Sequence, residues 1–290
     1  MADRLVKFLS HVDMVKIMCV ETTNLVEEAR KIHNLNPTPT AALGRTLTMA
    51  TMMGAMQKEE DGKITIQIIG NGPLGKIIVS ANNRSEVKGC VDNPLAEAPL
   101  NEKGKLNVSA IVGQGQLNVI KDIGLKEPYV GNVPLQTGEI AEDFAYYYAV
   151  SEQIPTAVAL GVLVNQDGSV KKAGGYIIQA TPDTPEEILK LIENRIAESD
   201  SMTQMLEKGM TLEEIAIYIS DDLNTYAVEE CTPIYQCDCS KERMERALLC
   251  LSKNDIMDLA NDDVTEICCH FCNKKYQFSK AEMLKLHELK

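Results

Sequence analysis

Cysteines gather near the end of this chain, and their spacing is the feature that most limits how the chain can fold. The last 60 residues hold seven of the nine cysteines. Cys237-Asp-Cys239 is followed, after 29 intervening residues, by Cys269-His-Phe-Cys272. Two such pairs can supply the four thiolate ligands of a tetrahedral zinc ion. The spacing therefore predicts one Zn²⁺ site on these four cysteines.

The motif alone leaves three interpretations of this site open. It could be a purely structural zinc site, a redox-active zinc site, or a site that forms a disulfide or holds no metal. His270 lies inside the second pair, but four thiolates already complete a zinc site, so we do not expect this histidine to be a ligand. Three further cysteines fit neither pair, and their roles stay open: Cys231, Cys250 and Cys268.

The chain divides into three regions by composition. Residues 181–230 hold 3 basic and 13 acidic residues, and so carry most of the net charge of −13. Residues 1–180 and 231–290 are close to neutral. An acidic chain without a basic face argues against nucleic-acid binding, which needs cations to neutralise phosphates. Repulsion between like charges also makes the acidic region marginally stable.

Residues 1–180 are predicted to form an α+β core with mixed sheets and helices. Two hairpins are expected, over Lys63–Ser80 with the turn "GNGPLG" and over Val158–Ala180 with the turn "NQDGS". Helices are expected over Thr23–Leu35, Thr40–Met56 and Glu139–Glu152. Hairpins mixed with helices favour the α+β class over a doubly wound parallel sheet.

Residues 181–230 are predicted to be a helical linker, and residues 231–290 a small zinc-binding module. In the linker, apolar residues recur at helical spacing at Ile188, Leu191, Ile192 and Ile196. Short acidic helices of this kind need a surface to pack on. The last region has little apolar material, and a module of this size seldom folds without a metal or disulfides.

Several protein classes lack support in the sequence. No run of 18 apolar residues predicts a membrane span, and the first residues lack a secretory signal, so we expect a cytoplasmic protein with reduced thiols. The four histidines are scattered, and no nucleotide-binding motif is present, so we do not expect an enzyme. Two alternatives are kept: a thiol-disulfide oxidoreductase, and a structural zinc-ribbon binding protein supported only by Lys274 and Lys275.

Longer stretches of the chain resemble one known family. "CDCS" and "CHFCNKKYQF" resemble the C-terminal signature of the heat-shock protein 33 family, which are redox-regulated holdase chaperones of the bacterial cytosol. "GNGPLGKIIVSANNRSEVKGCV" and "SEQIPTAVALGV" agree with this resemblance, which runs over essentially the whole chain. One departure is Cys90, where an aromatic residue such as tyrosine is expected.

The resemblance implies a mechanism in which the reduced protein holds one Zn²⁺ on four cysteines and is inactive. Oxidation would pair Cys237 with Cys239 and Cys269 with Cys272, release zinc, and unfold the module and the linker. The exposed apolar surface, with the linker residues Ile188, Leu191, Ile192 and Ile196 as candidates, would then bind unfolding proteins. The active form would be a homodimer that uses no ATP and binds neither nucleic acid nor membrane.

Overall fold

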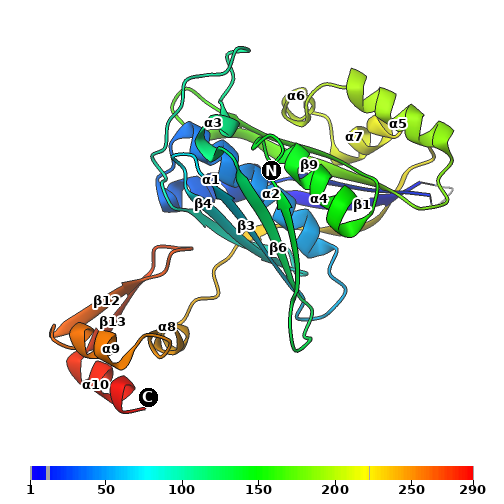
Figure 1. Ribbon diagram of the computed structural model, residues 1–290. Coiled ribbons are helices and arrows are strands. Elements are labelled where there is room, and N and C mark those ends of the chain that lie inside the picture. The colour runs from blue at the N-terminus through cyan, green and yellow to red at the C-terminus, as the bar shows by residue number, and fades with distance from the viewer. Residues whose placement is uncertain (1, 11–13, 222, 290) are drawn as a thin grey trace. The chain divides into compact units, whose positions relative to one another are not determined.

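The chain folds into two compact units, described here for residues 2–10, 14–221 and 223–289 by a computed structural model (Figure 1). The first unit is Met1–Tyr235 and the second is Gln236–Lys290. Both combine strands with helices, so the α+β class is confirmed. The predicted division into three regions, with a separate linker, stays a prediction.

The first unit contains two sheets, and both predicted hairpins are confirmed as β3–β4 and β8–β9. The strands of the first sheet are, in spatial order, β10 (Tyr226–Cys231), β1 (Arg4–Leu9), β2 (Val15–Glu21), β9 (Val170–Ala180) and β8 (Thr156–Val164). Those of the second are β11 (Ile234–Tyr235), β5 (Glu86–Val91), β4 (Lys76–Asn82), β3 (Lys63–Gly70), β6 (Gly115–Asp122) and β7 (Tyr129–Pro134). The strand pairs are antiparallel apart from β11–β5, which is parallel.

Helix α2 (Pro37–Ala55) is the centre of the first unit, because it packs against strands of both sheets. Nearly all of its residues are buried, and Met49, Met52 and Met53 are among them. The helix begins three residues before the expected Thr40. Pro37 is its first residue, where a missing backbone N–H costs no helical hydrogen bond.

Shorter helices complete the first unit. They are α1 (Thr23–His33), α3 (Val108–Val112), α4 (Ala141–Tyr147) and the π-helical turn η1 (Tyr148–Glu152) that follows α4. The carboxylate of Asp3 caps α1, because it accepts hydrogen bonds from the backbone N–H groups of Asn24 at 3.0 Å and Leu25 at 2.8 Å. No helix in the described ranges has both the length and the apolar composition to cross a membrane.

The acidic region forms helices α5 (Glu186–Glu198), α6 (Met202–Glu207) and α7 (Leu212–Ile219), which lie together in Figure 1. Their apolar side chains form one cluster with Val6, Phe8 and Ile17 of the first sheet. Ile192 is buried in this cluster, and Ile188, Leu191 and Ile196 pack against it half-buried. The predicted packing of this stripe on the core is therefore confirmed.

The segment from β10 to β11 joins the two sheets of the first unit. β10 pairs with β1, and two residues later β11 pairs with β5. The side chain of Tyr235 ends this segment and is 8% exposed. Its hydroxyl donates to the carbonyl oxygen of Gly89 at 2.8 Å and lies 3.1 Å from Nε2 of His33. Tyr235 thus anchors the chain two residues before Cys237.

The second unit has a small core. It contains α8 (Lys241–Leu248), α9 (Lys253–Leu259), the antiparallel hairpin β12 (Val264–Cys268) and β13 (Lys275–Ser279), and α10 (Lys280–Glu288). Eight residues are buried in its cluster: Leu248, Ile256, Ala260, Cys269, Tyr276, Phe278, Met283 and Leu286. So few buried side chains are a weak basis for independent folding.

The hydroxyl of Tyr235 gives a prediction for the first unit. Tyr235→Phe should lower its free energy of unfolding by about 1–2 kcal/mol, because the ring stays while a buried hydrogen bond is lost. Urea unfolding of the full chain, followed at the transition of this unit, measures the change. The matched control is Tyr146→Phe, since no hydrogen bond of the Tyr146 hydroxyl is found in the described chain. Equal stability of the two variants would contradict the anchoring role.

Candidate metal centre

The second unit brings together the four cysteines of the two motifs. The Sγ atoms of Cys237, Cys239, Cys269 and Cys272 all lie within 4.8 Å of one another. The first two belong to the segment that leads into α8, and the last two to the turn between β12 and β13. The sequence therefore identified a group of four thiols that converge in space and could hold one metal ion.

Backbone hydrogen bonds shape the turn that holds the second pair. The N–H of Cys269 donates to the carbonyl oxygen of Lys274 at 2.9 Å, and the N–H of Asn273 donates to that of Cys269 at 2.8 Å. Asn273 has a φ of 57°, a left-handed conformation that asparagine adopts more readily than most residues. The chain reverses direction in this turn, which keeps both sulfurs of the C-x-x-C motif close to those of Cys237 and Cys239.

The first pair is held by the start of α8. Ser240 caps this helix, since its hydroxyl oxygen accepts a hydrogen bond from the N–H of Arg243 at 3.3 Å. The Arg243 guanidinium in turn forms an ion pair with the carboxylate of Asp238 and donates to its carbonyl oxygen at 3.1 Å. The residue between the two cysteines is therefore fixed, which limits the conformations of the C-x-C loop.

The sulfur spacing fits zinc. The Sγ atoms of Cys237 and Cys269 are 3.7 Å apart, and those of Cys239 and Cys272 are 3.4 Å apart. Ligands of a tetrahedral ion with Zn–S bonds of about 2.3 Å lie about 3.8 Å from one another. A disulfide would need about 2.05 Å, and all four cysteines are free thiols here. Four converging sulfur donors with this spacing match the preferences of Zn²⁺.

The four thiols differ in acidity because their surroundings differ. Burial raises the pKa of Cys239, but hydrogen bonds from Tyr276 and Cys272 outweigh burial and lower this pKa to about 7. Burial raises the pKa of Cys237 well above its usual range and that of Cys272 to about 11. Cys239 is therefore the most acidic thiol of these three, and the first of them to become a thiolate.

Tyr276 is a supporting residue that the sequence did not single out. Its hydroxyl on β13 donates to the Sγ of Cys239 at 3.1 Å and lies 2.9 Å from the carbonyl oxygen of the same residue. A tyrosine four residues after a C-x-x-C motif carries no distinctive spacing, so only the folded structure, which brings β13 to the segment before α8, reveals this contact. Residues that hydrogen-bond to metal ligands fix the ligand orientation and tune its basicity.

The remaining cysteines lie outside the group of four. Cys268 and Cys250 are exposed, and His270 is also exposed and absent from the group, in line with the expectation that it is no ligand. Cys231 belongs to the first unit, where its Sγ lies 3.0 Å from the hydroxyl oxygen of Ser85. Cys269 and Cys272 lie in a β-hairpin turn rather than at the start of a helix in a βαβ unit, which is the context of a dithiol oxidoreductase.

The fold and this site together define a class of protein, an α+β body joined to a small four-cysteine metal module. The sequence model of the family described as "Hsp33 protein" matches residues 3–279. The chain is 50% identical over 293 residues to a "33 kDa chaperonin" of Clostridium perfringens, covering 100% of this chain and 92% of that protein. The chain therefore belongs to the Hsp33 family.

Other relatives agree with this assignment. A "33 kDa chaperonin" of Clostridium beijerinckii is 46% identical over 285 residues, covering 98% of this chain and 97% of that protein. The crystal structure of the 33 kDa chaperonin (heat shock protein 33 homolog) of Thermotoga maritima has a TM-score of 0.91 at 37% identity, covering 100% of this chain and 99% of that one. The names of these relatives describe chaperonins rather than enzymes.

The geometry predicts which cysteines bind metal. The reduced chain should bind one Zn²⁺, and Cys239→Ser should lose it, because serine cannot supply a thiolate. Cys268→Ser, although next to Cys269, should keep full occupancy and is the matched control. Zinc per chain, measured by atomic emission after gel filtration, checks this. Zinc retained by Cys239→Ser, or lost by Cys268→Ser, would mean that a different ligand set holds the ion.

Proposed function

We propose that this protein is a redox-regulated, ATP-independent holdase chaperone. The single observation that carries the proposal is the group of four free, converging thiols in a chain of the Hsp33 family. The chaperonin names of its relatives support the chaperone part. The redox part rests on the chemistry of the cysteines, argued below.

In the proposed resting state, Cys237, Cys239, Cys269 and Cys272 hold one Zn²⁺ as thiolates. A bound structural zinc ion supplies apparent binding free energy of about 10–16 kcal/mol in small domains, and this is folding free energy. The second unit has a core of only eight buried residues, which supports such dependence. In the same state the Ile188, Leu191, Ile192 and Ile196 stripe is packed against the first sheet and is closed to clients.

In the proposed active state, Cys237 pairs with Cys239 and Cys269 pairs with Cys272. Each disulfide forms as two thiolates lose two electrons, and hydrogen peroxide takes up these electrons with two protons from the solvent and is reduced to two water molecules. Disulfide sulfurs are no longer thiolates, so they release the metal. All four sulfurs lie within 4.8 Å, so each proposed pair is within reach after small side-chain movements.

Loss of the metal then affects the rest of the chain through its weakest parts. The second unit unfolds first, because its core is small. The acidic helices α5 to α7 follow, since the region that holds them carries repelling charges, and α5 buries only Ile192 fully among its described residues. Their release exposes two apolar faces, the stripe itself and the sheet surface beneath it, and such surfaces bind unfolded chains. The active protein is proposed to dimerise in the cytoplasm, without ATP, nucleic acid or membrane as partners.

The first test couples three measurements on one sample. Peroxide with mild heat should release one zinc, remove four free thiols and create suppression of client aggregation, all with the same time course. Zinc is followed with a chromogenic chelator, thiols by mass mapping after alkylation, and aggregation by light scattering of a thermally unfolded client. Zinc release without any gain in aggregation suppression would mean that the zinc site has only a structural role.

A second test separates linker release from cysteine chemistry. Ile192→Asp should suppress client aggregation in the reduced, zinc-loaded state, because a charge cannot stay in a site where an isoleucine is 5% exposed. Burial of that side chain is worth about 1.5–3 kcal/mol, enough to loosen a short helix. Ala197→Asp adds the same charge to an exposed position of α5 and should stay inactive. If both variants need peroxide, linker packing does not control activity.

A further inference from the structure

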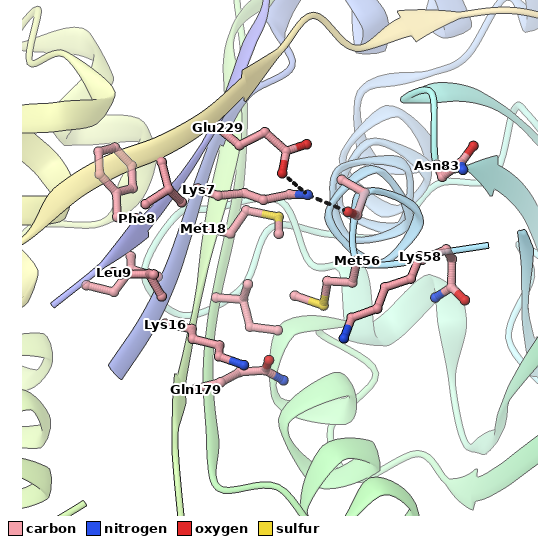
Figure 2. A pocket seen from close by; sticks show the side chains of 15 residues that line it. Lys7, Phe8, Leu9, Lys16, Met18, Met56, Lys58, Asn83, Gln179 and Glu229 are labelled. Carbon is pink, nitrogen blue, oxygen red and sulfur yellow. Dashed lines mark hydrogen bonds and ion pairs between the residues drawn. The ribbon is translucent and has the colours of Figure 1, made fainter. Parts of the chain in front are cut away.

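A cavity of about 690 Å³ opens in the first unit, between the sheet face that covers α2 and the C-terminal end of that helix (Figure 2). Its volume falls in the range of small-molecule sites. Every residue that lines it belongs to the first unit, and none is a cysteine. The proposed redox function makes no use of this cavity.

The strand register places charged and apolar side chains in rows along the cavity wall. Glu229, Lys7, Met18 and Ile177 form one row across β10, β1, β2 and β9. Lys7 is neutralised there, because its Nζ lies 2.8 Å from the Glu229 carboxylate and 2.7 Å from the carbonyl oxygen of Ala55. Met18 and Ile177 are therefore the uncharged residues of this row that line the cavity.

Two further lysines approach the same space without a counter-charge. Lys16 lies on β2 opposite Gln179 of β9, and Lys58 follows the end of α2. Figure 2 shows their ammonium ends reaching toward the cavity from opposite sides. Neither forms an ion pair or side-chain hydrogen bond with any residue that the structure describes. In a chain of net charge −13, this is a local excess of positive charge.

The space between these lysines is apolar and adaptable. Met18 and Met56 lie there, and methionine side chains fit irregular alkyl groups well. A second cavity of about 310 Å³ shares Met56, Lys58 and Gln179 with the first. Its lining adds Tyr148, Ile154, Glu59 and the ion pair of Lys121 with Glu152. The two adjoining cavities are called the groove below.

We propose that this groove binds a monoanionic amphiphile with a linear alkyl chain, such as a fatty-acid carboxylate. The carboxylate lies between Lys16 and Lys58, where the Gln179 amide can donate a hydrogen bond, and the alkyl chain follows Met18 and Met56. A single negative charge fits better than a polyphosphate, because only two lysines at the site, Lys16 and Lys58, are not already in an ion pair with a described residue. This site is present in the reduced protein and is independent of the redox switch.

The test uses the reduced full-length chain in the presence of zinc, labelled with ¹³C at the methionine methyl groups. Dodecanoate is the probe, below its micelle concentration, with dodecanol and dodecyltrimethylammonium as neutral and cationic comparisons. Dodecanoate should shift the methyl signals of Met18 and Met56 and leave that of Met283, in the second unit, unchanged. Dodecanol should bind more weakly, and the cation should not bind.

Charge variants complete the test. Lys16→Gln and Lys58→Gln should each weaken dodecanoate binding by about threefold, and the double variant by about tenfold, as expected for exposed charge pairs. Lys103→Gln removes an exposed lysine elsewhere and should change nothing. Equal affinity for dodecanoate and dodecanol, or unchanged binding in the double variant, would overturn the proposal. Displacement of dodecanoate at lower concentration by an acidic, leucine-rich peptide would assign the groove to polypeptides instead.

Discussion

The convergence of four thiols is the constraint around which the second unit is arranged. The unit places four thiols around one point, yet buries only eight residues in its core. Hydrogen bonds and an ion pair order the two cysteine loops, but they do so at exposed positions where each contributes little. Without a metal ion, burial raises the pKa of the Cys237 and Cys272 thiols and so disfavours their thiolate forms. The proposed metal ligation would therefore supply stability that this small core does not.

The first unit obtains its stability in a different way. Helix α2 is buried between two sheets, and its methionines and alanines are part of one large cluster. Such a core does not depend on oxidation state, because none of the four clustered cysteines contributes to it. Helices α5 to α7 differ again, since they depend on one sheet face for their burial and belong to region 181–230, which holds most of the excess charge.

Local patterns in the sequence predicted the parts of the structure that local forces determine. The hairpin turns, the helix of α2 and the stripe at Ile192 follow from turn residues and helical spacing. The four metal-site cysteines were predicted because two short motifs limit the geometry strongly. Tyr276 was not predicted, because its contact with Cys239 joins β13 to a segment 37 residues earlier in the chain, and no local pattern shows that. The exposed strand β10 was also missed, since five of its six residues face solvent and show no apolar alternation.

The segment of β10 and β11 has a consequence for the edges of both sheets. A strand at the edge of a sheet exposes unpaired N–H and C=O groups, to which other chains can add. β10 covers β1, and β11 covers the start of β5, with only two residues between them. One short stretch of backbone therefore caps two sheets at once, directly before Cys237. While this stretch stays paired, neither β1 nor that part of β5 offers a template for strand addition; if it came away, two strand edges would open together.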